Sequence, residues 1–279
     1  MKYLRTSYLN SYELCPYLTK ELYGDLSEDA PKEYNADDDE QGFYAEFGKI
    51  LHELFEKWGR AKMKKEKYVQ EQMVTDYEKS LVTLKNNYPD GKEQDYILSG
   101  YEQIEYFYNK YSSSIPIGVE LRFPDIKLID KIPLPFTGTL DRIEGIPEKQ
   151  YIDLYDYKTG SHIKYTKAEL KDNIQTTVYS LYIRSKYGFF PKTFSFLFTK
   201  TKKERTINIT EDFIRRGIER IYRDYLRMES GLWEPTGNHS DYFCQNFCES
   251  KTCPKKHRSR NSGWGELKKT GKPPDFLKK

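Results

Sequence analysis

The chain has 279 residues, of which 37% are hydrophobic and 15% aromatic. It is therefore long enough for one large domain with a hydrophobic core, and a disordered protein is excluded. No segment is long and apolar enough to span a bilayer, and the N-terminal residues lack the apolar run of a signal peptide. We therefore expect a cytoplasmic protein with no membrane partner.

The net charge of +3 is unevenly distributed along the chain. Residues 21–46 carry ten acidic side chains and one lysine, a net charge of −9, whereas residues 251–279 carry ten basic and two acidic ones, a net charge of +8. The acidic segment is typical of a surface loop. The basic segment is typical either of an arm that contacts nucleic-acid phosphates or of a solvated terminus.

The first half of the chain has the periodicity of helices. In Ala45–Lys65 the apolar side chains fall on one stripe: Phe47, Ile50, Leu51, Leu54, Phe55 and Trp58. Two further helices are predicted over Gln70–Tyr88 and Gln94–Tyr111, separated by the turn residues Pro89-Asp90-Gly91. These two helices predict a helical insertion at about residues 66–112.

The pattern then changes to segments rich in aromatic and β-branched residues. They predict four strands, over Gly118–Phe123, Leu134–Gly145, Tyr151–Lys158 and Thr193–Lys200. A helix over Lys167–Tyr187, ended by Gly188, lies between the last two strands, and a final helix over Glu211–Ser230 follows the potential N-cap Thr210. A strand–helix–strand unit implies a parallel pair, and strands close in sequence form antiparallel neighbours. We therefore expect an α/β fold with a mixed central sheet flanked by helices.

The segment Tyr151–Gly160, with the sequence YIDLYDYKTG, carries the most chemical information. Side chains alternate along a strand, so Asp156 and Lys158 project from one face, together with apolar side chains. A carboxylate and an ammonium at the buried end of a strand are costly unless they are paired or bind a metal ion. Asp141 ends the preceding strand. Two converging aspartates with a lysine beside them can hold a hard divalent cation and activate a water molecule.

Four short motifs follow one another in the chain: Gly48-Lys49-Ile50-Leu51-His52, Gly138-Thr139-Leu140-Asp141, Asp156-Tyr157-Lys158-Thr159-Gly160 and Gln175-Thr176-Thr177-Val178-Tyr179. In this order and on these elements, they resemble the G-x-x-x-H, G-x-x-D, D-x-K-T-G and Q-x-x-x-Y motifs of the RecB-like branch of the PD-(D/E)xK nuclease superfamily. The resemblance spans residues 48–179 and implies a restriction-endonuclease-like core.

The same resemblance implies a role for each motif residue. The ligands of a Mg²⁺ or Mn²⁺ ion would be His52, Asp141, Asp156 and the carbonyl oxygen of Tyr157. Lys158 would orient or deprotonate the attacking water. Gln175 and Tyr179 would brace the site and contact the DNA backbone. Glu120, at the start of the first strand, is a further acidic candidate.

Structural interpretations of these residues remain open. His52 lies away from the apolar stripe of its helix, beside two glycines, so it is either a ligand or a surface histidine. Asp156 and Lys158 could form a simple ion pair, although the second aspartate motif argues against this as their only role. Gln175 and Tyr179 are four residues apart on one helix face and could merely pack together.

The chain has four cysteines, Cys15 near one end and Cys244, Cys248 and Cys253 near the other. In an intracellular protein this clustering indicates a metal site rather than disulfides, and thiolates favour zinc or an iron–sulfur cluster. For zinc, His257 is an alternative ligand. Buried cysteines without a metal are the remaining alternative.

One cysteine before the nuclease motifs and three after them is an arrangement similar to that of RecB-like nucleases with a four-cysteine [4Fe–4S] cluster, among them the AddB nuclease domain and the CRISPR-associated adaptation nuclease. The resemblance implies that the four cysteines ligate a cluster that staples the ends of one nuclease domain, residues 1–250. A basic tail, residues 254–279, would follow. The spacing here is C-x3-C-x4-C, whereas those relatives usually have C-x2-C-x5-C, so the middle ligand is displaced by one residue.

These resemblances imply a metal-dependent DNA exonuclease that hydrolyses phosphodiester bonds in single-stranded DNA or at DNA ends, in recombination, repair, replication or CRISPR-type processing. DNA is favoured over RNA because the chain has no RNA-specific motif. The alternative is a noncatalytic DNA-binding module that keeps the nuclease-like fold and the iron–sulfur cluster. The converging charges of Asp141, Asp156 and Lys158 argue against it, because a site without function has no physical reason to keep them.

Overall fold

The computed structural model describes residues 3–24, 26, 40–84, 88, 91–160, 170–235, 250 and 252–253. The chain forms two compact units. The terminal unit comprises Met1–Tyr34, Lys131–Pro135 and Arg220–Lys279, and the sheet unit comprises Asn35–Asp130 and Phe136–Glu219. All four nuclease-like motifs lie in the sheet unit.

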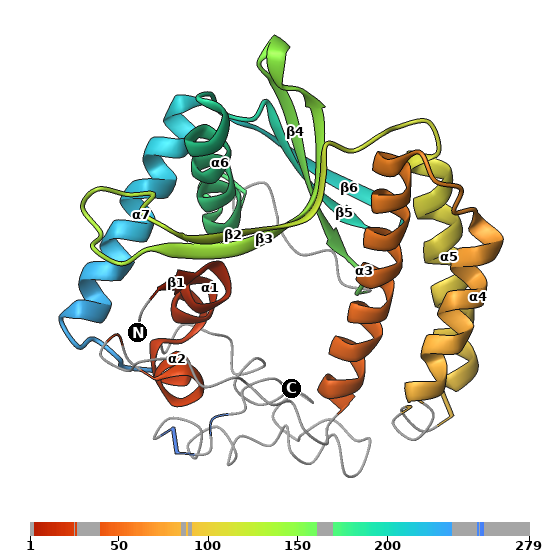
Figure 1. Cartoon of the computed structure of the whole chain (residues 1–279). Helices are drawn as coiled ribbons and strands as arrows, with labels where there is room; N and C mark the ends of the chain where they lie inside the picture. The colour runs from red at the N-terminus through yellow and green to blue at the C-terminus, as the bar shows by residue number, and fades with distance from the viewer. Residues whose placement is uncertain are drawn as a thin grey trace, which may run out of the picture. The chain divides into compact units, whose positions relative to one another are not determined.

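The sheet unit is built on five strands: β2 (Gly118–Ile126), β3 (Phe136–Ile146), β4 (Tyr151–Lys158), β5 (Thr193–Phe198) and β6 (Lys203–Asn208). They lie side by side in the order β2-β3-β4-β5-β6. β4 and β5 are parallel, and the other neighbouring pairs are antiparallel. The parallel pair arises because the helix α6 (Ile174–Tyr187) carries the chain from the end of β4 back to the start of β5 (Figure 1).

Helices cover both faces of this sheet (Figure 1). On one face lie α3 (Glu40–Lys64), α4 (Gln70–Leu81), the short 3-10 helix η1 (Val82–Leu84) and α5 (Glu93–Tyr111), and on the other lie α6 and the first part of α7 (Glu211–Glu229). β5 is apolar on both faces because it is covered from both sides: Phe194, Phe196, Leu197 and Phe198 are all fully buried.

Aromatic packing fixes α3, the helix that carries His52. The rings of Phe55 on α3 and Phe107 on α5 stack with their centroids 3.9 Å apart. Trp58 is completely buried, with its ring 5.5 Å from that of Phe107 in an edge-on contact. Aromatic pairs of this kind add to the free energy of apolar burial. His52 is therefore carried by a helix that the core holds in place.

The terminal unit contains β1 (Leu4–Arg5), α1 (Thr6–Leu14), α2 (Pro16–Tyr23) and the second part of α7. Pro16 is the first residue of α2. An N–H group at this position has no partner within the helix, so proline, which lacks the group, loses no hydrogen bond there. Both guanidinium sides of Arg220 on α7 donate to the carboxylate of Glu13 on α1. Among the helices that the structure describes, none is long and apolar enough to cross a membrane.

The predicted α/β fold, with a mixed sheet flanked by helices, is confirmed, and β4 has the predicted bounds. The ends of other elements differ. α3 begins at Glu40 rather than Ala45, and α6 begins at Ile174 rather than Lys167. The later start of α6 has a physical cause, since the side chain of Asn173 accepts a hydrogen bond from the backbone of Thr176 and caps the helix there.

Five short elements were not predicted: β1, α1, α2, β6 and the 3-10 helix η2 (Pro147–Lys149). Ile207 is the one buried side chain of β6, whose other residues are polar, so the alternation that marks a strand is absent from its sequence. An edge strand needs no second apolar face. The acidic segment 21–46, predicted as a loop, is helical at both ends, because Glu21 lies in α2 and α3 begins at Glu40. Its middle part, residues 27–39, lies outside the described residues, as do the turn residues Pro89 and Asp90 and the tail 254–279. The single domain over residues 1–250 stays a prediction.

Candidate active site

Three acidic side chains come from three neighbouring strands. Glu120 lies on β2, Asp141 on β3 and Asp156 on β4. The residues before and after Glu120 pair with the residues on either side of Asp141, so Glu120 lies opposite Asp141. The last residue pair between β3 and β4 comes directly next to Asp141 on β3 and to Asp156 on β4. Neighbouring strands are about 4.8 Å apart, so the sheet gathers carboxylates that are distant in the sequence into one small region.

His52 on α3 joins two of these carboxylates. Its Nδ1 atom lies 3.7 Å from Oε1 of Glu120 and 3.7 Å from Oδ2 of Asp141. One ligand atom from each of the three residues lies within 4.8 Å of the other two. An imidazole nitrogen and two carboxylate oxygens are donors that divalent cations accept, so the trio of His52, Glu120 and Asp141 fits a metal site.

Glu120 reaches the trio through an unusual backbone conformation. Its φ angle is +42°, in the left-handed region that residues with side chains rarely adopt. Such a conformation costs about 1–3 kcal/mol and persists only where the surroundings impose it. In the middle of a strand, an outlier at a charged residue indicates a functional constraint rather than a folding requirement.

Asp156 is held by a different set of partners. Its Oδ2 atom lies 2.5 Å from Nζ of Lys158, and its Oδ1 atom accepts a 2.5 Å hydrogen bond from Nε2 of Gln175. The same nitrogen of Gln175 donates to the hydroxyl of Tyr179 at 3.4 Å. The side chain of Asp156 is 6% exposed and that of Lys158 is 31% exposed, so a buried carboxylate holds an ammonium that still reaches the surface.

The backbone of Tyr157 orients Asp141. Its N–H donates a 2.6 Å hydrogen bond to Oδ2 of Asp141. The ring of Tyr157 is buried, with its centroid 5.5 Å from that of Phe55 and 5.3 Å from that of Phe107. The core that holds α3 therefore also fixes the carboxylate that faces His52. The ligand role of the Tyr157 carbonyl stays a prediction.

Two of the motif glycines are needed for close packing. A Cβ atom on Gly48 would lie 3.0 Å from Oγ1 of Thr159, so α3 passes directly against the end of β4. A Cβ atom on Gly138 would lie 2.7 Å from Cζ of Phe123 and 3.1 Å from Cε1 of Tyr179. These short distances explain why both positions need glycine, which the spacing of the motifs in the sequence does not reveal.

The crowding of charge shifts two pKa values. Burial lowers the pKa of His52, but the surrounding carboxylates, Asp141 first among them, outweigh it and raise this pKa to about 9. Burial and the negative charge of Asp156 raise the pKa of Asp141 to about 7. The site therefore has more negative charge than it readily keeps without a proton or a cation.

A buried arginine braces β3 next to Asp141 and was not predicted. Arg142 is fully buried, its Nε donates a 2.7 Å hydrogen bond to Glu144, and its guanidinium lies 4.1 Å from the centroid of the Tyr111 ring. Breaking such a pair leaves a buried charge, which is strongly destabilising. β3 also carries Asp141 and Glu144, so no local pattern in the sequence marks Arg142 as buried.

The end of β4 is braced in a similar way. The N–H of Thr199 donates a 3.0 Å hydrogen bond to the carbonyl oxygen of Lys158, and its hydroxyl donates to the side chain of Gln103 on α5. Thr199 and Gln103 are both fully buried. No local sequence pattern links residues so far apart in the chain.

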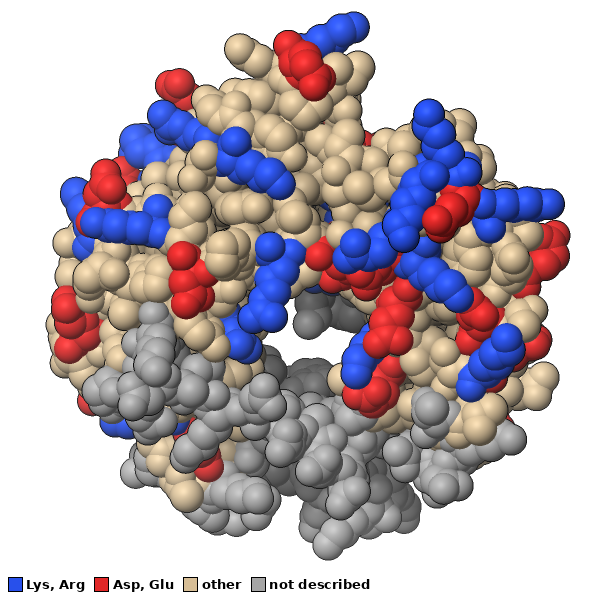
Figure 2. Space-filling view, viewed as in Figure 1, with Lys and Arg blue, Asp and Glu red and all other residues tan. Residues whose placement is uncertain are grey.

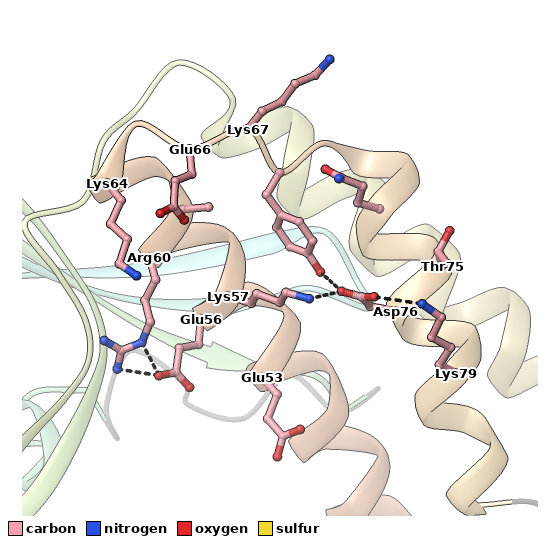
Figure 3. A pocket seen from close by; sticks show the side chains of 13 residues that line it. Glu53, Glu56, Lys57, Arg60, Lys64, Glu66, Lys67, Thr75, Asp76 and Lys79 are labelled. Atoms are coloured by element: carbon pink, nitrogen blue, oxygen red, sulfur yellow. Dashed lines mark hydrogen bonds and ion pairs between the residues drawn. The ribbon is translucent and has the colours of Figure 1, made fainter.

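A separate groove of about 680 Å³ lies between α3 and α4 (Figure 3). Some of its charged side chains form ion pairs with one another, Lys57 with Asp76 and Arg60 with Glu56. Basic and acidic side chains also alternate along α3 on the face seen in Figure 2, without gathering into a basic patch. No member of the metal-binding trio lines the groove, so we assign the chemistry to the trio.

The cysteine site can be followed in part. Cys15 and Cys253 are both buried and form no disulfide. Their neighbours meet, since the hydroxyl of Tyr17 lies 2.9 Å from Oγ1 of Thr252. The other residues predicted for this site, Cys244 and Cys248, and the alternative ligand His257 lie outside the described residues.

Comparison with known proteins identifies the family. The sequence matches the family model of the PD-(D/E)XK nuclease superfamily over residues 6–256, which include all four motifs. No protein among the curated sequences matches it. Among solved structures, it is similar to a "Putative exonuclease" from Eubacterium rectale, at 15% identity and a TM-score of 0.46, with 84% of each chain covered. On the family match, this chain belongs to the PD-(D/E)XK nuclease superfamily.

Proposed function

We propose that this protein is a Mg²⁺- or Mn²⁺-dependent DNA exonuclease of the RecB-like branch, acting on single-stranded DNA or on DNA ends. The observation that carries the proposal is the convergence of His52, Glu120 and Asp141, with Lys158 on the strand beside them. Membership of the superfamily implies a divalent metal ion and a nucleic-acid substrate. The choice of DNA and of exonucleolytic cleavage rests on the order of the four sequence motifs.

The trio of His52, Glu120 and Asp141 would hold the ion. Asp156 is also a predicted ligand, but its two oxygens are engaged by Lys158 and Gln175, so we propose that it chiefly positions the lysine. Bound at the trio, a divalent cation supplies positive charge to the scissile phosphate and favours ionisation of the attacking water.

Lys158 would act on the phosphate. Its ammonium is oriented by Asp156 and is partly exposed, so it can meet a bound phosphodiester without rearrangement. In hydrolysis, the oxygen of a water molecule bonds to phosphorus, and the bond from phosphorus to the leaving sugar oxygen breaks. An ammonium donates hydrogen bonds and has no lone pair, so Lys158 would stabilise the charge that develops on the nonbridging oxygens.

Gln175 and Tyr179 would brace this arrangement from α6. Gln175 fixes Asp156 through its side-chain amide, and Tyr179 lies within hydrogen-bonding distance of that amide. Groups that orient the residues of a metal site commonly contribute about 10–100-fold to its activity or metal affinity. Their predicted contact with the DNA backbone remains part of the proposal.

We further propose that Cys15, Cys244, Cys248 and Cys253 hold a [4Fe–4S] cluster. The burial of Cys15 and Cys253 and the contact between their neighbours Tyr17 and Thr252 support a shared site. Protein purified without oxygen should be brown, with broad visible absorption that Cys→Ser variants lose. A colourless protein with stoichiometric zinc would show that the cysteines bind zinc instead of a cluster.

The nuclease proposal is tested with DNA labelled separately at its 5′ and 3′ ends, single- and double-stranded, in Mg²⁺, Mn²⁺ or EDTA. We expect one label to be released progressively, and only with a metal ion. The double variant Asp156→Ala/Lys158→Ala should bind DNA without cutting it. The matched control is Glu148→Ala/Lys149→Ala, an exposed acidic residue and lysine at the other end of β4, which should cut normally.

Two outcomes would decide against the proposal. Cleavage that survives Asp156→Ala/Lys158→Ala would exclude the mechanism in which Asp156 positions Lys158 on the phosphate. Wild-type protein that binds DNA but cuts it with neither metal ion would favour the noncatalytic DNA-binding module.

A further inference from the structure

α3 packs against three strands of the sheet. A Cβ atom on Gly59 would meet Val119 of β2, Phe55 packs on Tyr157 of β4, and His52 lies beside Glu120 and Asp141. Gly48 then meets Thr159 at the end of β4. The residue one further turn along is Tyr44. Its ring contacts that of Tyr96 on α5.

Tyr44 is an exposed aromatic residue in line with the candidate metal site. Its side chain is 43% exposed, although the ring contacts Phe43 and Tyr96. Tyr44, Gly48 and His52 are spaced four residues apart and so follow one side of the helix. At about 1.5 Å per residue, Tyr44 lies about 12 Å from His52 along the helix axis, the length of a few nucleotides.

The turn between β5 and β6 brings three lysines to the same place. Lys200, Lys202 and Lys203 surround this turn, which we call the lysine turn (Thr199–Lys203). It adjoins the catalytic motif, because the N–H of Thr199 donates to the carbonyl oxygen of Lys158. Among the described residues, none of the three lysines forms an ion pair with an acidic side chain.

One ring joins the lysine turn to Tyr44. The ammonium of Lys200 lies 5.5 Å from the centroid of the Tyr96 ring, and the ring of Tyr44 lies 5.8 Å from the same centroid. Tyr96 is nearly buried, so it positions both groups without occupying the surface itself. An aromatic face and a cluster of positive charge are therefore neighbours next to Lys158.

Lys202 occupies its position at a conformational cost. Its φ angle is +54°, where glycine is the ordinary residue of a tight turn. Glycine would adopt this conformation without cost, so the strain is the cost of having a lysine at this position.

We infer that Tyr44 and the lysine turn form a subsite for a nucleotide of the substrate strand beside the scissile phosphate. The inference rests on the proposed nuclease function. A base would stack on the exposed ring of Tyr44, and the lysines would contact the adjoining phosphates. Single-strand binding sites combine an aromatic stacking surface with positive charge in this way. A base inside a duplex has both faces covered by the neighbouring base pairs, so the subsite selects an unpaired strand.

The test measures binding without cleavage, by fluorescence anisotropy of a labelled short oligothymidylate with the full-length protein in EDTA. Tyr44→Ala should weaken binding about tenfold, and Tyr44→Phe, which keeps the ring, should bind like the wild type. Lys200→Ala and Lys202→Gly should each weaken binding and lower the slope of log affinity against log salt by about 0.7. Lys202→Gly should also raise the melting temperature, because it relieves the strained turn.

The sheet unit offers a matched control pair at its other end. Tyr151 is 39% exposed and the ammonium of Lys192 lies 5.4 Å from its ring centroid, an arrangement like that of the subsite but at the start of β4. Tyr151→Ala and Lys192→Ala should leave oligothymidylate binding unchanged. Equal losses in the control and subsite variants would overturn the inference, as would wild-type binding by Tyr44→Ala.

The experiments distinguish a failure of the subsite proposal from a failure of the nuclease proposal. Wild-type protein that cuts DNA while Tyr44→Ala binds and cuts with an unchanged KM would overturn the subsite alone. Wild-type protein that does not bind oligothymidylate would also overturn the subsite. Wild-type protein that binds the strand through Tyr44 but cuts no DNA in Mg²⁺ or Mn²⁺ would overturn the nuclease and keep the subsite.

Discussion

The side-chain amide of Gln175 on α6 donates a 2.5 Å hydrogen bond to Oδ1 of Asp156 on β4. The other carboxylate oxygen of Asp156 holds Lys158 at 2.5 Å. A helix on one face of the sheet therefore fixes the ammonium that we place beside the scissile phosphate. Gln175 is buried, so it can act through Asp156 without touching the substrate.

Gln175→Ala should lower the cleavage rate by about 10–100-fold, because Asp156 loses the donor that orients it and Lys158 becomes mobile. The effect should appear in kcat more than in KM, since the change affects the orientation of groups rather than the binding of the strand. Steady-state kinetics on an end-labelled strand measure both values.

Ser180→Ala is the control for this prediction. Ser180 is a buried hydroxyl on the same helix, and its oxygen makes no hydrogen bond among the described residues. Its removal should leave kcat unchanged. An equal loss in the two variants would show that general disturbance of α6, rather than the hydrogen bond to Asp156, governs the rate.

Gly138→Ala should destabilise the sheet unit by about 1–3 kcal/mol, because inserting a methyl group into a packed core forces its neighbours to move. The added carbon would lie 2.7 Å from Phe123 and 3.1 Å from Tyr179, and both side chains are buried. Urea denaturation measures the loss. Gly160→Ala is the matched change in the next motif, where no atom of the described residues lies within 4 Å, and it should cost far less. Similar losses for the two variants would contradict the steric role of Gly138.

The sequence predicted some strands and site residues correctly and gave no signal for others. β4 was predicted with its correct bounds because it is rich in aromatic and β-branched residues, whereas polar β6 gave no such signal. His52 and Asp141 were predicted as partners, and their atoms lie 3.7 Å apart. The place of Glu120 depends on a strained φ angle, and that of Tyr44 on the contact of its ring with Tyr96. Neither is a property of local sequence.

Glu13 should make the stability of the terminal unit depend on pH. Burial outweighs the hydrogen bonds from Arg220 and raises the pKa of Glu13 from its ordinary 4.5 to about 7, and Asp224 acts in the same direction. Between these pH values the folded state binds more protons than the unfolded chain. The free energy of unfolding should therefore fall as pH rises through this window, by about 1–3 kcal/mol, and this contribution should be constant above it.

Hydrogen exchange of the α1 amides, corrected for intrinsic rates, measures this dependence between pH 5 and 8. Glu13→Gln should remove the slope, because its amide does not titrate. Protection that increases with pH over the same range would contradict the prediction, because it would mean that the ion pair with Arg220 outweighs the burial of Glu13.

The Mn²⁺ dependence of cleavage by Glu120→Gln tests the metal-binding trio most directly. If His52, Glu120 and Asp141 hold the ion, the half-saturating Mn²⁺ concentration should rise about 10–100-fold, and the rate should recover at high Mn²⁺. Glu148→Gln, an exposed change at the far end of β4, should keep the wild-type concentration. A Glu120→Gln protein with the wild-type rate and the wild-type half-saturating concentration would contradict the placement of the metal ion at this site.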